Sequence, residues 1–310
     1  MAALSPEGHR ILARQHGVAS LADFAAVGIA PWQVHDLVRR GGLELVLPGA
    51  WRSPSTASTE MQRCAAVCRA HPEVVIAGPT AGRIHGLRRL PHDRRIHVVA
   101  PPASNPTIHP CVKPFRTATL SADDFIVRDD GIRVLDRPRT ALDLARFVAD
   151  DDLSSIVEQC MHDGRHDDTE MVSVAVPWIS PRRRWVRRYL DALDRRIDGP
   201  AAESHLEMIL GDRLRAAGLH DLVRQHVIEV PGHGIIRFDI AVPSSRWAVE
   251  VDGFPTHRET NGRRADAERD AAARRVGWVT IRVGPYDLGE RLGTTVRRLT
   301  ASFASHRQAS

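Results

Sequence analysis

The clearest alternation of hydrophobic and polar positions lies in two runs near the C-terminal end of the chain, 237–243 and 247–253. Apolar residues take every second position in both runs, which is the pattern of half-buried β-strands. The link 243–246 reads Pro-Ser-Ser-Arg and favours a turn, so the two runs are predicted to form a hairpin. Asp239 then lies on the polar side of the first strand, and Glu250 and Asp252 lie on the polar side of the second.

Helical patterns flank this hairpin on both sides. Apolar residues at helical spacing follow Ser204 and stop at Gly218, and Ser204 with Glu207 matches a capping box, which by itself can explain that glutamate. A second helix is predicted over about 263–276, ended by Gly277, and 278–283 reads as another strand. The predicted order is therefore helix, strand, strand, helix, strand.

The first 55 residues predict three short helices followed by a small hairpin. Each helix begins at a capping residue or a proline and stops at a glycine, and the hairpin turns at Pro48-Gly49. This outline is that of a winged helix-turn-helix, whose last helix enters the major groove of DNA. Trp32 is expected in the core, and small domains of this outline also serve in protein contacts alone. The exposed candidates for DNA contact on the third helix are Gln33, His35, Asp36, Arg39 and Arg40.

The middle of the chain predicts a second domain of mixed α/β character. Apolar strands are expected at 74–77 and 96–100, and a further patterned run covers 132–145. The glycines of 78–87 fit neither the P-loop nor the dinucleotide-binding fingerprint by their spacing.

A basic run precedes the C-terminal elements. Its arginines suit sequence-independent contact with phosphates, whereas Trp185, Tyr189 and Leu193 suit the buried side of an amphipathic helix, and both can hold together. The arginines are Arg182, Arg183, Arg184, Arg187 and Arg188.

The predicted fold class is a multi-domain mixed α/β protein. Its domains are a winged helix-turn-helix over 1–55, an α/β domain over 56–170, a basic helical linker over 171–200 and an α/β core over 201–310.

Composition agrees with a nucleic-acid partner and opposes a membrane protein. The 310 residues carry a net charge of +5, with a pI of about 9.5. Neither end has an apolar run of signal-peptide or membrane-span length, so a cytoplasmic protein is expected. Of the four cysteines, Cys64 and Cys68 stand one helical turn apart, but without a second Cys/His pair nearby they are expected to be buried reduced thiols rather than metal ligands.

Three carboxylates on one side of a hairpin repel one another and raise each other's pKa unless a cation neutralises them. Magnesium and manganese prefer hard oxygen ligands of this kind. The alternative is that the acids are the water-facing side of an amphipathic hairpin. Taken together with Glu207, the set favours a metal site with Glu207, Asp239 and Glu250 as ligands.

In the order of these motifs, residues 203–283 resemble the PD-(D/E)XK nuclease superfamily, and within it the bacterial branch related to the very-short-patch mismatch-repair endonuclease. The motifs that carry the resemblance are Ser204-x-x-Glu207, Phe238-Asp239, the run 249–253, His257, Arg269-Asp270 and the run 277–282. The resemblance implies a restriction-endonuclease-like core in which acidic residues bind Mg²⁺ or Mn²⁺ and phosphodiester bonds are cleaved. Arg269 and Arg282 are then candidates for phosphate contact.

This sequence departs from the superfamily at one position. Lysine usually stands two residues after the second acid, where this chain has Asp252, and its single lysine is Lys113. The very-short-patch branch uses histidine instead, so by resemblance His257 is the candidate general base.

The first half resembles the AbiEi-type antitoxins, which act as transcriptional repressors. The matching runs are 17–20, 28–30, 38–43 and 48–52, followed by Thr-Ala-Gly-x-x-His-Gly-Leu at 80–87 and Arg-Thr-x-x-Asp-Leu at 139–144.

Two functions from different classes follow. The first is a metal-dependent DNA endonuclease with Glu207, Asp239, Glu250, Asp252 and His257 as its catalytic residues, acting on damaged, mismatched or foreign DNA, with RNA not excluded as substrate. The second is a non-catalytic DNA-binding regulator of the antitoxin type whose nuclease fold has lost activity.

Overall fold

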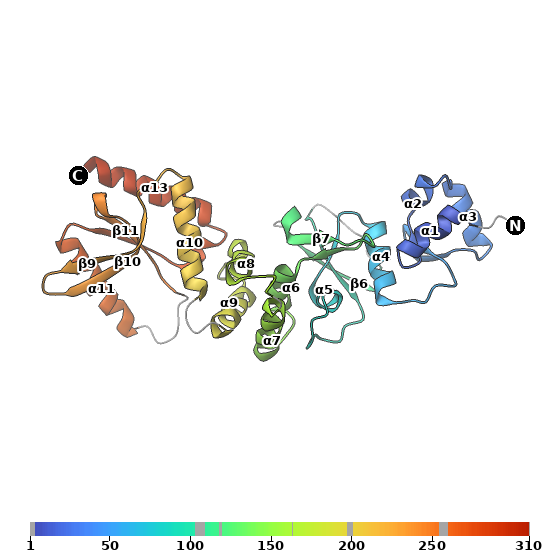
Figure 1. Cartoon of the computed structure of the whole chain (residues 1–310), viewed down its shortest axis with the longest axis horizontal. Coiled ribbons are helices and arrows are strands. Elements are labelled where there is room, and N and C mark those ends of the chain that lie inside the picture. Colours follow the sequence, from blue (N-terminus) through green and yellow to red (C-terminus); the bar gives the residue numbers. More distant parts are fainter. Residues whose placement is uncertain are drawn as a thin grey trace. The chain divides into compact units, whose positions relative to one another are not determined.

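The computed structural model describes residues 4–102, 109–117, 120–162, 164–196, 201–253 and 260–309. It is a mixed α/β protein with three separate sheets, which confirms the predicted fold class (Figure 1). The chain divides into two compact units, Met1–Asp163 and Gly164–Ser310.

The first unit begins with the predicted three helices and hairpin. Ser20 and Asp23 cap the second helix reciprocally, with Ser20 Oγ accepting from Asp23 N at 3.2 Å and Asp23 Oδ2 accepting from Ser20 N at 2.8 Å. A short strand after the first helix joins the hairpin in an antiparallel sheet of order β1-β3-β2. The elements are α1 (Pro6–Arg14), β1 (Val18–Ala19), α2 (Leu21–Ala26), α3 (Pro31–Arg39), β2 (Glu44–Leu47) and β3 (Ala50–Arg52).

The prediction that Trp32 lies in the core is wrong, because 70% of its surface is exposed. Helix α3 buries Val34 and Leu37, which lie three residues apart on one side. Trp32 stands two residues before Val34, about 200° around the helix, and therefore points away from that side.

The middle of the first unit is a five-stranded mixed sheet of order β6-β5-β4-β8-β7 with helices packed against it. The glycine-rich run predicted after the first strand starts helix α5. The elements are α4 (Glu60–Ala70), β4 (Val75–Ile76), α5 (Gly78–Ile84), β5 (Ile96–Ala100), β6 (Val112–Arg116), η1 (Ala122–Asp124), β7 (Phe125–Val127), β8 (Arg133–Leu135), α6 (Arg137–Leu144) and α7 (Asp150–Met161).

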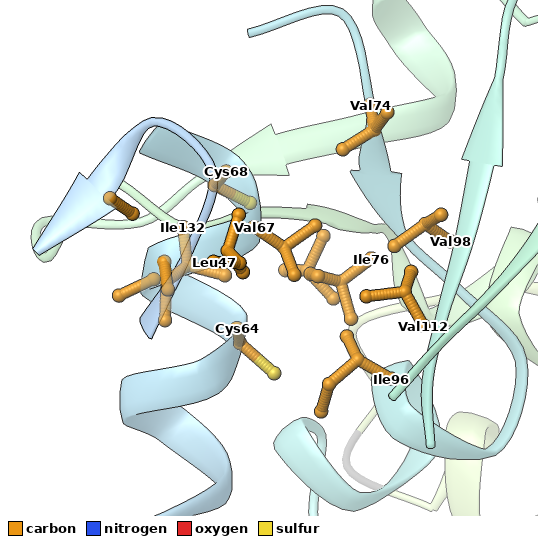
Figure 2. Close-up of a cluster of buried hydrophobic side chains, with 14 of the residues drawn as sticks. Leu47, Cys64, Val67, Cys68, Val74, Ile76, Ile96, Val98, Val112 and Ile132 are labelled. Carbon is orange, nitrogen blue, oxygen red and sulfur yellow. The ribbon is translucent and has the colours of Figure 1, made fainter. Parts of the chain in front are cut away.

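One hydrophobic core joins the N-terminal sheet to this middle region (Figure 2). Val18, Leu47 and Ala50 pack in the same cluster as Cys64 and Val67 of α4. Trp51, next to Ala50, instead packs in the separate core of the three N-terminal helices. The β2–β3 hairpin therefore lies between two cores, and the predicted division at residue 55 falls inside one compact unit.

The cysteines are free thiols, as expected. Cys64, Cys68 and Cys160 are buried, and Cys111 is half-buried. Burial raises the pKa of the Cys64 and Cys68 thiols, which keeps both protonated and unreactive.

The second unit holds the predicted helix-strand-strand-helix-strand order, with one strand more than predicted. Strand β9 precedes the hairpin and pairs with β10, so the sheet has the order β12-β11-β10-β9, in which only β11 and β12 are parallel. Its elements are α8 (Asp168–Ser173), η2 (Val176–Trp178), α9 (Arg184–Arg196), α10 (Ala201–Ala216), β9 (Val223–Val230), β10 (Gly234–Val242), η3 (Pro243–Ser245), β11 (Trp247–Val251), α11 (Thr260–Arg275), β12 (Val279–Val283), α12 (Pro285–Leu288) and α13 (Leu292–Ala309).

Helices that precede and helices that follow the strands in the sequence complete this unit (Figure 1). Helix α10 packs against α13, β10 and β11, and α11 packs against β12. The basic run forms α9, whose Tyr189 and Leu193 are buried as expected, while Trp185 is half-buried. Tyr189 Oη donates to the main-chain oxygen of Met171 at 3.0 Å, which ties α9 to α8. Among the described helices, none combines the length and the hydrophobicity that crossing a membrane requires.

Because the core is shared, we expect the first unit to unfold in a single cooperative transition. Leu47 is 3% exposed and packs against α4, so Leu47→Ala is expected to lower the free energy of unfolding by about 2–4 kcal/mol. The matched control is Leu45→Ala on the same strand, because Leu45 is 56% exposed and its loss is expected to cost less than about 0.5 kcal/mol.

Urea unfolding of residues 1–163 followed by tryptophan fluorescence, which reports on Trp32 and Trp51 of the N-terminal region, and by circular dichroism, which reports on the whole unit, measures both effects. Two separated transitions, or a Leu47→Ala loss seen by only one probe, would contradict the shared core.

Candidate functional site

Asp239 and Glu250 meet where the pairing of β10 and β11 ends. The last paired residues of the two strands are Ile240 and Val249, and Asp239 and Glu250 are the next residue of each. Asp239 Oδ2 accepts the main-chain N–H of Val251 at 2.9 Å, so a side-chain carboxylate supplies the acceptor where the strand ladder stops. This bond fixes the Asp239 carboxylate beside β11.

Glu250 is buried beside this carboxylate, with 5% of its surface exposed. Burial, the negative charge of Asp239 and a side-chain hydrogen bond with Asp239 together raise the pKa of Glu250 to about 8, against the opposing charge of Arg269. Arg269 Nη2 donates to Glu250 Oε1 at 2.8 Å and also to the main-chain oxygen of Arg237. The pair therefore carries negative charge that one arginine compensates only in part.

The pair opens into a cleft of about 610 Å³. Four carboxylates and three guanidinium groups line it, together with three aliphatic side chains, of which Val227 and Ile235 are 53% and 75% exposed and Val251 is buried. The lining residues are Val227, Ile235, Arg237, Asp239, Glu250, Val251, Asp252, Gly253, Asp266, Arg269 and Arg282.

Arg282 forms one wall of the cleft through three ion pairs. Its guanidinium lies 2.7 Å from Asp252, 3.4 Å from Asp266 and 3.0 Å from Asp270. Burial opposes the charge of Arg282, but hydrogen bonds and attraction from Asp270 and Asp252 raise its pKa well above the ordinary value. Asp252 is therefore neutralised by an arginine from the neighbouring strand β12.

Glu207 lies close to Asp239 but outside the lining of the cleft. Its carboxylate is 7% exposed, accepts from Gln225 Nε2 at 2.8 Å and lies 3.6 Å from Arg224. Burial and the charge of Asp239 raise its pKa. The capping-box explanation of Glu207 is wrong, because α10 already begins at Ala201 and Glu207 lies in its second turn.

Among the residues that the structure describes, no group of three or more His, Cys, Asp or Glu side chains is arranged to hold one metal ion. The predicted ligands are thus divided: Asp239 and Glu250 are in contact, and Glu207 joins them only through Gln225. A carboxylate pair still fits Mg²⁺ or Mn²⁺, because magnesium is held by one or two carboxylates and keeps several waters. The predicted general base His257 lies outside the described residues.

Sequence reasoning missed three residues of this site. Gln225 stands on strand β9, which was not predicted. Two inward positions of this strand carry the polar residues Arg224 and His226, so its sequence does not show the alternation of apolar and polar residues that is typical of a strand. Asp266 reaches Arg282 from α11. Arg237 lines the cleft, and its exposed side chain makes no ion pair with any residue in the described part of the chain. The only signal for Arg237 was its polar position two residues before Asp239.

The candidates for DNA contact on α3 are only partly free. Gln33 Oε1 accepts from Ala30 N at 2.7 Å and so caps the helix, and exposed His35 meets Trp51 edge-on at 6.5 Å between ring centroids. Exposed Arg39 and Arg40 both pair with Asp36, at 2.6 and 2.8 Å. Ion pairs at the surface are weak and exchange readily for phosphate.

The basic run around α9 lines a hollow of about 460 Å³ in the second unit. Arg183 lies over the Trp178 ring at 4.9 Å and pairs with Glu290, and Arg187 lies 3.8 Å from Asp191. Arg182 and Arg184 are exposed, and Arg188 is half-buried. Four of these five arginines, all except Arg182, line the hollow together with Tyr286.

The raised pKa of Glu250 predicts a stability difference that depends on pH. The fold favours protonated Glu250, so the contribution of this group is fully present below its ordinary pKa of 4.5 and is lost as pH rises towards about 8. With a chelator present, Glu250→Gln is therefore expected to match the wild type near pH 4.5 and to exceed its free energy of unfolding by about 2 kcal/mol at pH 8.

Urea unfolding at several pH values measures this difference. The control is Glu229→Gln, an exposed carboxylate on β9, for which the difference from wild type is expected to stay constant with pH. A Glu250→Gln difference that does not grow between pH 5 and pH 8 would contradict the burial of an uncompensated carboxylate.

Comparison with known proteins finds similarity in structure but not in sequence. No protein-family model and no curated protein sequence matches this chain. The chain is similar to the crystal structure of the RV2827C protein from Mycobacterium tuberculosis, with 19% sequence identity and a TM-score of 0.43. The match covers 62% of this chain and 76% of the mycobacterial chain.

Proposed function

We propose that the second unit is an endonuclease domain that hydrolyses phosphodiester bonds in DNA with the help of Mg²⁺ or Mn²⁺. The observation that carries the proposal is the contact of half-buried Asp239 with buried Glu250 in the lining of a cleft. Two carboxylates held together at a place where one of them is buried are costly unless a cation joins them. The order of motifs that resembles the PD-(D/E)XK superfamily gives the same assignment.

Each side chain has a separate task in this proposal. Asp239 and Glu250 hold the ion, which when bound activates water and stabilises negative charge on the phosphate. Arg269 orients Glu250 through their 2.8 Å hydrogen bond. Arg237, exposed in the same cleft and without an ion pair among the described residues, binds the phosphate backbone. His257 is kept as general base on the resemblance alone.

Two further basic regions suit a nucleic-acid partner. Helix α3 exposes Trp32, His35 and Arg39 in the first unit, and the start of α9 gathers arginines in the second. Arginine neutralises phosphates whatever the base sequence, so both regions would add affinity, and the base contacts of α3 would add selectivity. RNA offers the same phosphates and enters the test as a second substrate.

The alternative is a DNA-binding regulator of the antitoxin type without nuclease activity. Asp252 in place of lysine favours it, because its carboxylate is tied to Arg282 and cannot assist proton transfer as lysine does. The resemblance of the first half to antitoxins favours it as well. The nuclease proposal is preferred because a regulator has no use for the pair of carboxylates in the cleft.

A plasmid-nicking assay separates the two functions. In Mg²⁺ or Mn²⁺ the wild type is expected to convert supercoiled DNA to open-circular or linear DNA, and a chelator is expected to stop it. Asp239→Asn and Glu250→Gln are expected to lower the rate about a hundredfold or more, since each removes a ligand charge that stabilises the transition state.

Two controls accompany this assay. Glu229→Gln removes an exposed carboxylate of β9 outside the cleft lining, and Lys113→Ala removes the single lysine, and both are expected to cleave at the wild-type rate. Absence of cleavage of any DNA or RNA, together with tight binding of duplex DNA, would establish the regulator instead.

A further inference from the structure

Gln225 has an unusual backbone in the middle of a strand. Its φ is +52°, in the left-handed region that non-glycine residues seldom adopt. The neighbouring pairs between β9 and β10 are Phe238 with His226 and Ile240 with Arg224, so Gln225 stands opposite Asp239. Strained backbone of this kind persists only where the surroundings over-determine it, and it concentrates at functional sites.

The side chain of Gln225 joins two carboxylates. Its Nε2 donates to Glu207 Oε2 at 2.8 Å, and the same nitrogen lies 3.4 Å from Asp239 Oδ1. An amide nitrogen has two hydrogens and can serve both acceptors at once. The bridge holds two mutually repelling groups side by side and fixes the direction in which Asp239 faces.

Glu207 is held away from the cleft by the same contacts. Its Oε2 is occupied by Gln225 and faces Arg224 at 3.6 Å, and Glu207 does not line the cleft that Asp239 and Glu250 share. Glu207 Oε2 thus already meets two donors of the protein, and the residue lies apart from the cleft in which an ion would be bound. The sequence motif predicts Glu207 as a third ligand beside Asp239 and Glu250, but these contacts set it apart from that pair.

We propose that Glu207 and Gln225 are positioning residues: Glu207 anchors the amide of Gln225, and the amide fixes Asp239 for the cation that Asp239 and Glu250 hold. The inference rests on the proposed function and assigns Glu207 a different role from a metal ligand. Partners that orient a ligand without touching the ion usually contribute about 10–100-fold in metal affinity.

Binding of Mn²⁺ alone, measured by isothermal titration calorimetry on the full chain without DNA, distinguishes the two roles of Glu207. Glu207→Gln keeps the shape and an oxygen that accepts from Gln225, so its Mn²⁺ affinity is expected to stay within about threefold of wild type, whereas Glu207→Ala is expected to lose about tenfold. Asp239→Asn removes a ligand charge and is expected to abolish measurable binding. Loss in Glu207→Gln as large as in Asp239→Asn would overturn the inference.

Gln225→Gly tests the second member of the bridge. Glycine adopts a positive φ without strain, so the strand is kept while the amide is removed, and Mn²⁺ affinity is expected to fall about tenfold. Arg246→Gly is the matched control, because Arg246 also has a positive φ, +49°, in the same unit but lies in the turn between β10 and β11. Its Mn²⁺ affinity is expected to be unchanged.

The double variant Glu207→Ala/Gln225→Gly completes the cycle. Because the two residues act in series, its affinity is expected to equal that of either single variant rather than the product of both losses. Additive losses would overturn the inference. Wild-type binding of Mn²⁺ without cleavage of DNA would refute the proposed nuclease but leave the positioning roles standing, while no binding of Mn²⁺ by the wild type would overturn both.

Discussion

Contact between Asp239 and Glu250 is the constraint around which the second unit is arranged. The charged form of Glu250 is not easily held there, because burial disfavours it and the neighbouring charge of Asp239 disfavours it further. The protein supplies a main-chain N–H and the amide of Gln225 for Asp239 and the guanidinium of Arg269 for Glu250, and both carboxylates line an open cleft. A cation between the two carboxylates would offset this repulsion, as the proposed function requires.

Two arginines of the cleft differ in how they are held: Arg282 is ion-paired within the protein, and Arg237 is exposed. Arg282 joins β12 to α11 and to the end of β11 through three carboxylates, so its charge is spent within the protein and it holds the wall of the cleft in place. Arg237 has no such partner among the described residues and is exposed beside the carboxylates. Of the two arginines, Arg237 is therefore the more accessible cation in the cleft, and phosphate contact by Arg282 stays a prediction.

The first unit is held together by hydrophobic packing on both faces of one hairpin. The β2–β3 hairpin gives Leu47 and Ala50 to the core around α4 and gives Trp51 to the core of the N-terminal helices. Because successive residues of a strand face opposite sides, one short hairpin can serve both. A hydrogen bond between His16 and Asp130 at 3.0 Å and an ion pair between Arg69 and Asp23 at 3.2 Å add to this junction. The N-terminal helices, including α3, are thereby fixed to the middle region rather than joined to it by a linker alone.

The sequence by itself determined the three N-terminal helices, the 43–51 hairpin, the 237–253 hairpin and the strand that begins after Gly277, because caps, turns and period-two alternation are written within a few residues. It also pointed to Asp239 and Glu250. Only the tertiary structure decided that Trp32 faces outward, that β9 completes the sheet, that Glu207 meets Asp239 through Gln225, and that Asp252 pairs with Arg282. These outcomes depend on which residues far apart in the chain are packed together, and no local pattern carries that information.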